Sequence, residues 1–548
     1  MRSSSHSSPR SRAAALATAA AAAAAVTVAL VPLTAAPATS SASAETRTGT
    51  TYYVDCAGGD DSASGTDQDS AWRTLAKAGA RTYEPGDRVL FARGTRCEGT
   101  FAPKGSGTAE APIRAGAYGE GGREDRREGR KGDQGGQGER RTAKPEIAGG
   151  GARAAVLLEN VEGWELRGLA VTNKGPATTT EPRAGILVRL TDHGTGRHYV
   201  VEDTDVHDVN GADVKDVEGS GGILFAAAGE KRPTAFDDVT VRGNSVAHVD
   251  RTGIGTASTW GKRPEHPNGP GTSFAPITGL AVRNNDVRDV GGDGIVTHNA
   301  VGARVEHNRV HGFNMRSAGY NAGVWSWNSD KVVTQFNEVS GGHGTRDSQA
   351  FDIDGGNNGN VFQYNYSHDN EGGFLLVCNG DGMTSDRNTV RYNVSLNDQN
   401  RSAPYGVVSV VCGPSTRTLV HNNTIATGVE GTPLVSGNGP GGVTFRNNVL
   451  AGAAGGSSVS AAPNTFDHNL YFRVPSVPSG DGGAVTGDPL FTGGADGTTP
   501  GSPAGIALRE GSPALGAGVP VQDNGGRDYF GNPVPDTPDL GAYHGGPR

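Results

Sequence analysis

From Asn244 onward, the chain repeats a short pattern of apolar and polar positions. An apolar stretch leads into an asparagine, one further residue follows, and then usually a second apolar residue. Successive asparagines are 21 to 41 residues apart. A repeat of this length with variable insertions predicts a solenoid, in which each coil stacks on the one before it. The repeated asparagines are Asn244, Asn285, Asn308, Asn337, Asn365, Asn393, Asn423, Asn448 and Asn469.

The repeated asparagine indicates which kind of solenoid this is. Asparagine is the non-glycine residue that best tolerates a left-handed backbone. Its side-chain amide can also bond to the amides of the asparagines above and below it. We therefore expect each asparagine to be a turn residue, and the whole set to form a ladder along a parallel β-helix.

A second strand pattern follows the variable loop of each coil and usually opens with glycine. Its second position is apolar in every coil, and side chains alternate between the two faces of a strand. We therefore expect the third and fifth positions to point outward. The third positions are Leu224, Gly255, Val296, Trp325, Asp352, Leu375 and Val408, and the fifth positions are Ala226, Ala257, His298, Trp327, Asp354, Val377 and Val410.

The polar and aromatic members of these two columns fall together in the middle three coils. With strands about 4.8 Å apart, they would share a patch about 10 Å across. A tryptophan offers a sugar ring a flat apolar face and an N–H donor. We interpret Trp325 and Trp327 as a sugar-binding platform with His298 beside it. The alternative is that both indoles pack under the preceding loop, residues 314–320.

Asp352 and Asp354 are the candidate catalytic carboxylates of this patch. Their backbones would lie about 6.7 Å apart. Inverting glycosidases separate their carboxyl groups by about 6.5–9.5 Å and retaining ones by about 5–5.5 Å, and side-chain rotamers reach both ranges. The alternative role is turn capping or a structural salt bridge. Glu371, in the loop before the next strand, is the preferred third carboxyl, and a solvated loop glutamate is the alternative.

Loops that lead into these strands supply further candidates. They carry His343 and Asp347, and Asp398 lies two coils further on. Arg251, Arg316, Arg346 and Arg401 occur once in each of four coils. Because arginine binds carboxylates through two parallel hydrogen bonds, this row could hold uronic acids. The alternative is that these arginines pair with nearby aspartates. The predicted substrate-binding residues are His298, Trp325, Trp327, His343, Arg316, Arg346 and Arg401.

The remaining segments have simpler patterns. Residues 1–44 combine arginines, an alanine-rich apolar run and a small-residue site, which predicts a signal peptide. Residues 45–118 are expected to form an N-terminal cap with a short helix over 71–78 and the first coils. Residues 119–143 are charged and of low complexity, which predicts a disordered insertion. Coils with the cleft should occupy 144–471, and the Gly/Pro-rich tail, 472–548, should pack back on them.

Composition and cysteine usage limit the class of protein. The chain has 548 residues, 86 glycines and a formal charge of −9, which argues against non-specific binding to nucleic acid or anionic membranes. Four cysteines fit an oxidising compartment. We expect disulfides Cys56–Cys97 and Cys378–Cys412, with two buried free thiols as the alternative for the second pair. A soluble, secreted monomer is expected.

Segments near both ends of the chain resemble a known family. Pro85-Gly86-Asp87-Arg88-Val89, Gly105-Ser106-Gly107-Thr108 and Ala111-Pro112-Ile113 resemble the entry of secreted right-handed parallel β-helix proteins of the pectate-lyase-like superfamily. The closing stretch, from Gly511-Ser512-Pro513 to Gly541-Ala542-Tyr543, is similar too. The resemblance implies an all-β, right-handed parallel β-helix that acts on polysaccharides.

Three functions remain open on the sequence alone. The first is a glycoside hydrolase in which Asp354 or Glu371 is the general acid and Asp352 activates water or attacks the sugar. It would need no cofactor. The second is a polysaccharide lyase for uronate-containing glycans, with calcium held by Asp352, Asp354 and Glu371 and with Arg346 or Arg401 as the base. The third is a carbohydrate-binding surface protein without catalytic activity.

Overall fold

The computed structural model describes residues 49–119, 143–177, 180–344, 346–399, 405–437, 439–494 and 499–545. They belong to one compact unit, Thr48–Arg548. The predicted signal peptide, the interior of the predicted insertion and Arg401 lie outside the described residues. Within the described part of the chain, no helix has the length and apolar character needed to cross a membrane.

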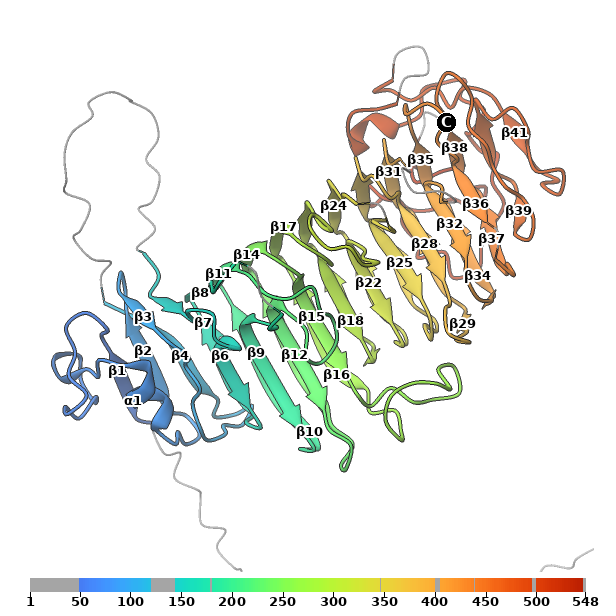
Figure 1. The fold of residues 1–548 in the computed structure, drawn as a ribbon. Coiled ribbons are helices and arrows are strands. Elements are labelled where there is room, and N and C mark those ends of the chain that lie inside the picture. The colour runs from blue at the N-terminus through green and yellow to red at the C-terminus, as the bar shows by residue number, and fades with distance from the viewer. Residues whose placement is uncertain are drawn as a thin grey trace, which may run out of the picture. The chain divides into compact units, whose positions relative to one another are not determined.

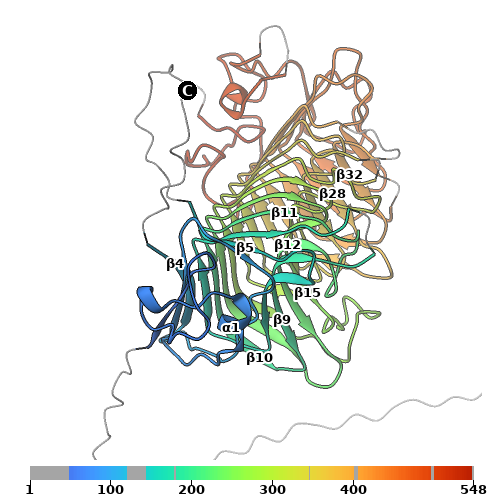
Figure 2. The same ribbon diagram turned by 60° about the vertical axis from the view of Figure 1, so that its left-hand side comes forward.

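The described residues form the predicted parallel β-helix. Each of the middle coils contributes one strand to each of three long parallel sheets, so that strands of one sheet pair with their counterparts one coil earlier and one coil later (Figure 1). A typical coil runs from β10 in sheet 1 through β11 in sheet 2 to β12 in sheet 3, and β13 then returns to sheet 1. The stacked coils are also visible from the side (Figure 2).

The strand boundaries follow the apolar pattern of each coil. Sheet 1 contains β1 (Thr51–Val54), β2 (Arg88–Ala92), β4 (Ile113–Tyr118), β7 (Trp164–Arg167), β10 (Thr195–Glu202), β13 (Ala235–Arg242), β16 (Ile277–Arg283), β19 (Ala300–Val301), β20 (Arg304–Glu306), β23 (Val333–Gln335), β26 (Val361–Gln363), β30 (Thr389–Arg391), β34 (Thr418–His421), β37 (Val443–Arg446) and β39 (Thr465–Asp467). Sheet 2 contains β3 (Arg96–Glu98), β5 (Glu146–Ala148), β8 (Ala170–Asn173), β11 (Asp205–Val209), β14 (Ser245–Val249), β17 (Asp286–Val290), β21 (Arg309–His311), β24 (Glu338–Ser340), β27 (Tyr366–His368), β31 (Val394–Leu396), β35 (Thr424–Ala426), β38 (Val449–Ala451), β40 (Leu470–Phe472) and β41 (Val485–Thr486). Sheet 3 contains β6 (Ala154–Glu159), β9 (Ala184–Thr191), β12 (Gly221–Ala228), β15 (Thr252–Ser258), β18 (Ile295–His298), β22 (Val324–Trp327), β25 (Phe351–Asp354), β28 (Leu375–Cys378), β32 (Val408–Val411) and β36 (Val435–Gly437). A separate pair consists of β29 (Ser385–Asp386) and β33 (Ser415–Thr416).

The interior of the coils is filled by apolar side chains from all three sheets. Val239 and Val241 of β13, Val246 of β14 and Ile254 of β15 are almost fully buried in one continuous cluster. Alternation along each strand therefore leaves the other side chains to face outward. On sheet 3 this outer face carries the candidate site.

The predicted asparagine ladder is confirmed. Along the whole set, the side-chain Nδ2 of each asparagine donates to Oδ1 of the asparagine one coil later, for example Asn337 to Asn365 at 3.0 Å and Asn365 to Asn393 at 2.9 Å. The ladder follows the turn between sheets 1 and 2 and ends at Asp481, whose Oδ2 accepts from Asn469 Nδ2 at 3.0 Å.

The predicted backbone role of these asparagines is wrong. The left-handed residue is the one immediately before each ladder asparagine, such as Phe336 (φ 55°), Tyr364 (φ 57°) and Tyr392 (φ 50°). The asparagine itself accepts a backbone N–H bond as well as the amide bond, as Asn365 does from Asn337 N at 3.0 Å. Its side-chain bonds hold the turn while its neighbour adopts the strained conformation.

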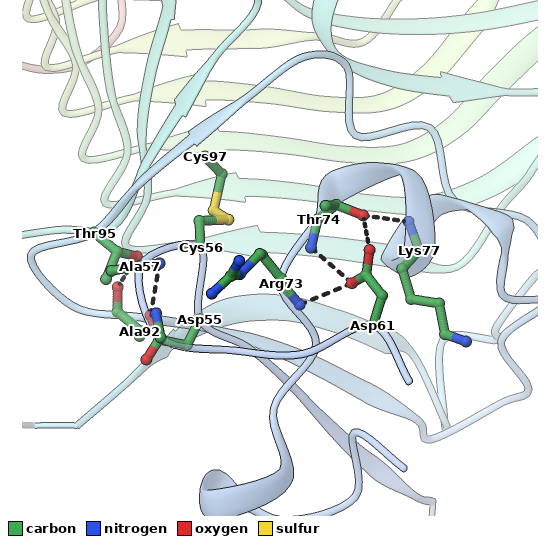
Figure 3. Close-up of a disulfide and its surroundings, with 11 residues drawn as sticks. Asp55, Cys56, Ala57, Asp61, Arg73, Thr74, Lys77, Ala92, Thr95 and Cys97 are labelled. Atoms are coloured by element: carbon green, nitrogen blue, oxygen red, sulfur yellow. Dashed lines mark hydrogen bonds between the residues drawn. A yellow bond between two sulfur atoms is a disulfide. The ribbon is translucent and has the colours of Figure 1, made fainter. Parts of the chain in front are cut away.

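The N-terminal end is closed by the predicted helix and a disulfide. The helix α1 (Leu75–Ala80) begins later than predicted because Thr74 caps it, accepting from Lys77 N at 3.1 Å. The Asp61 carboxylate in turn accepts from Thr74 N at 3.0 Å (Figure 3). The disulfide Cys56–Cys97 lies beside this helix (Figure 3). The second predicted disulfide, Cys378–Cys412, is also confirmed.

The C-terminal tail packs against the last coils. Phe491, Leu508 and Leu540 share a buried cluster with Leu396 of β31 and Val449 of β38. The described part of this tail is otherwise irregular and contains β41 and the short 3₁₀ segment η3 (Pro503–Ile506). Another short 3₁₀ segment, η1 (Gln68–Ser70), lies near the N-terminus.

Candidate active site

The outer face of sheet 3 brings the predicted aromatic and acidic residues together. Val296 of β18 pairs with Trp325 of β22, which pairs with Asp352 of β25. Two positions further along the strands, His298 pairs with Trp327. None of these side chains belongs to the interior cluster, which takes Ile295, Val324, Phe351 and Ile353 from the same strands. The middle of the groove floor therefore has the predicted composition.

Downstream of Asp354, the predicted columns are wrong by one residue. Asp352 pairs with Leu376 and Asp354 with Cys378, so the outward positions of β28 are not Leu375 and Val377. Those two side chains are buried in the interior, as are Val408 and Val410 of β32. The shift arises after Gly372-Gly373, because both glycines precede the strand: Phe351 pairs with Leu375, so Phe374 stands level with Ala350. Placing Gly373 level with Ala350 therefore moved the side chains of β28 to the other face.

Three carboxyl groups gather at the middle of the floor. Asp352 is only 5% exposed, and burial together with the nearby Asp354 and Asp347 raises its pKa well above the usual value. Burial raises the pKa of Asp354 to about 7, although a hydrogen bond from Gly355 N, at 2.6 Å, acts to lower it. Burial also raises the pKa of Asp347 to about 6, although a hydrogen bond from Tyr405 acts to lower it. Near neutral pH, Asp352 therefore keeps its proton, Asp354 is partly protonated and Asp347 is mostly ionised.

Glu371, the preferred third carboxyl in the sequence, is engaged by its own loop. Its Oε2 lies 2.7 Å from Nδ1 of His343. Asp347 is among the charges that raise the pKa of Asp352. Asp347 is therefore a further member of the cluster, and the catalytic role of Glu371 stays a prediction.

Trp325 is held in place by an ionic network. Its Nε1 donates to Asp293 Oδ1 at 3.0 Å, and Lys215 Nζ lies 5.1 Å from the centre of its ring. Asp293 is fully buried and also accepts from Arg251 Nη1 at 2.9 Å. Although burial acts in the opposite sense, Lys215 and Arg251 lower the pKa of Asp293. Trp325 is 6% exposed, so it forms part of the wall rather than an open platform.

Trp327 is the more accessible of the two indoles and lies between two imidazoles. The ring of His298 is 5.1 Å from it and that of His266 is 4.6 Å from it. Burial lowers the pKa of both histidines, that of His298 to about 4, so both rings are neutral at physiological pH. His266 comes from a long connection, residues 259–276, between β15 and β16. We call this connection the strap.

The strap forms one wall of the groove. Arg263 anchors it two coils further on, donating from Nε to Asn328 Oδ1 at 2.7 Å and from Nη1 to Asp330 Oδ2 at 2.6 Å. Further along, Asn268 Nδ2 donates to Asp381 O at 3.2 Å. The strap therefore passes the C-terminal ends of β22 and β25, where Trp327 and Asp354 lie.

The opposite wall includes the segment 211–220 between β11 and β12, which we call the upstream loop. Glu218 Oε1 is 2.6 Å from Arg189 Nη2 of β9, and Val217 packs on the apolar floor of β9 and β12. The upstream loop covers a small pocket of about 30 Å³ whose floor includes Leu224, Ala226, Gly255, Ala257 and Val296, with His298 and Trp325 at its downstream side. Small side chains on β15 create this hollow.

The described arginines of the predicted row are not aimed at the carboxyl cluster. Arg316 is 3.2 Å from Asp250 and also pairs with Asp289. The guanidinium of Arg346 lies 5.1 Å from the ring centre of Tyr320. Among the described residues, no three His, Cys, Asp or Glu side chains are grouped so that they could hold a metal ion, and Asp352, Asp354 and Glu371 do not form such a group.

Sequence reasoning missed Lys215, Asp293 and His266. Each comes from a connection whose length differs from coil to coil, so no column of the repeat contains it. The signal that was present is the length of the connection itself: long loops between short strands of a solenoid usually carry function.

No family model matches the chain. A lacto-N-biosidase of Bifidobacterium longum subsp. longum is 28% identical over 593 aligned residues, which cover 91% of this chain but only 36% of that protein. The chain thus spans about a third of the length of this curated relative. Crystal structures of a GH136 lacto-N-biosidase from Eubacterium ramulus, as native protein and as selenomethionine derivative, match with a TM-score of 0.57 at 23% identity. The native structure covers 76% of this chain and 67% of its own, and the likeness supports the β-helix fold.

Proposed function

We propose that this protein is a glycoside hydrolase that acts on oligosaccharides. The observation that carries the proposal is the cluster of Asp347, Asp352 and Asp354 on a groove floor beside two indoles, with pKa values raised toward neutrality. Glycosidases use two carboxyl groups, one protonated and one ionised, on either side of the bond that they cleave. The similarity to lacto-N-biosidases supports the same reaction class.

The two roles follow from the surroundings of each carboxyl. Asp354, half-buried and with its pKa raised to about 7 by burial, keeps a proton and is the proposed general acid. Asp347 accepts a hydrogen bond from Tyr405 and ionises first, at about 6, so it is the proposed nucleophile or base. Asp352 is the most deeply buried of the three, and a persistently protonated group cannot be the nucleophile. It would instead donate a hydrogen bond within the cluster.

The position of the pocket supports attack at a chain end. The upstream loop is fixed to β9 by the Glu218–Arg189 pair and covers the floor from β12 to β22, the strand that pairs with β25. The groove is therefore closed on its upstream side, immediately before the strand that carries Asp352 and Asp354. We propose that the enzyme releases a short unit from the end of its substrate.

A neutral glycan is the proposed substrate class. The groove floor carries three carboxyl groups. Arg316, a predicted partner for a uronate, is already paired with the acids Asp250 and Asp289. Burying an anionic sugar beside this cluster would add repulsion. Because the relatives are named lacto-N-biosidases, oligosaccharides that end in lacto-N-biose are the first candidates.

The test is product analysis with a panel of oligosaccharides and polysaccharides. We expect a reducing sugar of one short length, without the ultraviolet absorbance of unsaturated products. The dependence of kcat/KM on pH should fall below about 6, as Asp347 is protonated, and above about 7, as Asp354 loses its proton. Unsaturated products would show a lyase, and binding without any cleavage would show a non-catalytic carbohydrate-binding protein.

We also propose that the protein is exported and acts as a soluble monomer. Two disulfides, Cys56–Cys97 and Cys378–Cys412, support an oxidising location. N-terminal sequencing of the secreted protein tests export, and sedimentation of the purified protein tests the oligomeric state.

A further inference from the structure

Lys215 reaches the candidate site from a distant part of the chain. It lies in the upstream loop, between β11 and β12, yet its Nζ donates to Tyr320 O at 2.5 Å in the loop before β22. The same ammonium lies 5.1 Å from the ring centre of Trp325. The lysine thus crosses from the coil of β12 to the coil of β22, where the indole directly adjoins Asp352 of β25.

The ammonium lies beside the indole that adjoins Asp352, and its charge acts on all three acids. It lowers the pKa of Asp347, Asp352 and Asp354, in each case against the larger effect of burial. The cations of the predicted arginine row that the structure describes have other partners: Arg316 pairs with acids and Arg346 stacks on Tyr320.

Lys215 shares its nearest acid, Asp293, with Arg251. Asp293 is 3.8 Å from Nζ, a long ion pair, while Arg251 Nη1 holds the same oxygen at 2.9 Å. Asp213 of the upstream loop is 3.0 Å from Arg251 Nε. Asp216, on the same loop, is exposed to solvent, which screens its charge.

The remaining titratable groups around Lys215 are either uncharged at neutral pH or paired with another residue. His298 is uncharged at neutral pH because burial lowers its pKa to about 4. Tyr405 has its pKa raised by burial and stays protonated. Glu218 is paired with Arg189 at the far end of the upstream loop. The carboxyl cluster therefore shares the ammonium with Asp293, the acid that lies nearest to it.

We propose that Lys215 is a positioning residue for the carboxyl cluster: its ammonium, brought in by the upstream loop, keeps the second carboxylate ionised while Asp354 retains its proton. The inference rests on the proposed hydrolase function and extends it. Three crowded carboxyls tend to share protons, and an adjacent cation offsets that tendency. The loop that covers the pocket also carries the charge, so covering the pocket and ionising the second carboxylate occur together.

The first experiment compares the pH dependence of kcat/KM for the wild type, Lys215→Met and Lys215→Arg. Loss of the cation raises the pKa of every nearby carboxyl, so both limbs of the profile should move to higher pH by about one unit in Lys215→Met. Lys215→Arg should restore the wild-type profile. Lys231→Met, which removes an exposed lysine from the turn after β12, is the matched control. Unchanged limbs in Lys215→Met would overturn the proposal.

A second experiment needs no substrate. Fluorescence of the unliganded protein is titrated from about pH 4 to 9, with Trp325→Phe identifying the signal of the indole beside Asp352. The apparent pKa values should rise by about one unit in Lys215→Met and return in Lys215→Arg. Lys215→Gln is a second neutral variant if the methionine variant folds poorly.

The two experiments separate the two proposals. If the wild type cleaves no glycan but its titration shifts in Lys215→Met, the hydrolase function fails and the electrostatic role of Lys215 stands. If the enzyme cleaves glycans and the titration of Lys215→Met matches the wild type, the role of Lys215 fails and the hydrolase function stands.

Discussion

The turn between sheets 1 and 2 and the outer face of sheet 3 are built by the same stacking of coils, but they use it in opposite ways. At the turn, one residue type recurs from Asn244 to Asn469, and each amide repeats the bonds of the one before. On sheet 3, the outward position changes with every coil, from Gly255 to Val296, Trp325 and Asp352. Repetition occurs where the chain gains stability, and variation occurs where it forms a site.

The two regions also differ in how well their polar groups are satisfied. Each interior ladder amide donates two hydrogen bonds and accepts two, as Asn365 does. On the groove floor, Asp352 Oδ1 and His298 Nε2 are buried without a hydrogen-bond partner among the described residues. An unsatisfied buried group costs about 1–3 kcal/mol. The regular coils around the site therefore have to offset the free-energy cost of these unsatisfied groups.

The largest expected effect is on catalysis at the floor. Asp354→Asn removes the proposed general acid without changing its size, so kcat/KM should fall by about a hundredfold to ten-thousandfold. Steady-state assays with the identified oligosaccharide measure this loss. Asp205→Asn, on the outer face of β11, serves as the control and should have wild-type activity. An active Asp354→Asn enzyme would remove this residue from the mechanism.

A substitution in the asparagine ladder should lower stability and leave catalytic activity unchanged. Asn365→Ala removes an amide that accepts from Asn337 and donates to Thr334 O and Asn393, so the free energy of unfolding should drop by about 2–4 kcal/mol. Denaturant unfolding measures it, and activity per folded molecule should be unchanged. The control, Asn358→Ala, loses a single half-exposed bond to Asp330 and should cost under about 1 kcal/mol. Equal losses of unfolding free energy in the two variants would mean that the ladder bonds stabilise the fold no more than an ordinary surface hydrogen bond does.

A third expectation concerns stability against pH. The unfolded chain releases the proton of Asp354 at about pH 4, whereas the folded chain keeps it until about 7. The stabilisation from this group is therefore complete below about pH 4 and is lost as the pH rises to about 7. Asp354→Asn lacks this loss, so its stability relative to the wild type should rise by about 1–3 kcal/mol between pH 4 and 7. A pH-independent difference in unfolding free energy would contradict the raised pKa.

The smallest expected effect is on substrate binding. Trp327→Ala removes the accessible indole between His298 and His266, and KM should rise about fivefold, corresponding to about 1 kcal/mol. Trp327→Phe keeps a flat ring and should change KM much less. If both variants bind substrate like the wild type, Trp327 has only a packing role and the sugar platform lies elsewhere.

The fold was accessible from the sequence because its signal is repeated. Asparagines at regular intervals predict both the coils and the ladder, and apolar alternation places Trp325 and Asp352 on the outer face. The backbone assignment failed at one detail, since residues as bulky as Phe336 and Tyr364 take the left-handed conformation in place of the asparagines that follow them. The amide bonds of the ladder offset a local strain that residue preferences alone would assign elsewhere.

The site was accessible only where it follows the repeat. Asp352, Asp354, Trp325 and Trp327 are strand residues and could be aligned, until the double glycine before β28 shifted the register. Lys215 arrives on a loop from three coils away, and nothing in its local sequence indicates that path. Loop contacts of this kind depend on tertiary structure, which a periodic pattern does not encode.

The carboxylate at the end of the ladder has one more consequence. An asparagine amide can be turned round, exchanging its oxygen and its NH₂ group, but in the ladder the backbone fixes its orientation: Asn365 Oδ1 accepts from Asn337 N, and Asn365 Nδ2 donates to Thr334 O. The same bonds make the amides face one way from Asn244 to Asn469. Asp481 completes the row, because its Oδ2 accepts from both the backbone N and Nδ2 of Asn469. The amide dipoles of the ladder therefore all point in one direction, and the last of them has an acceptor where the repeat of asparagines stops.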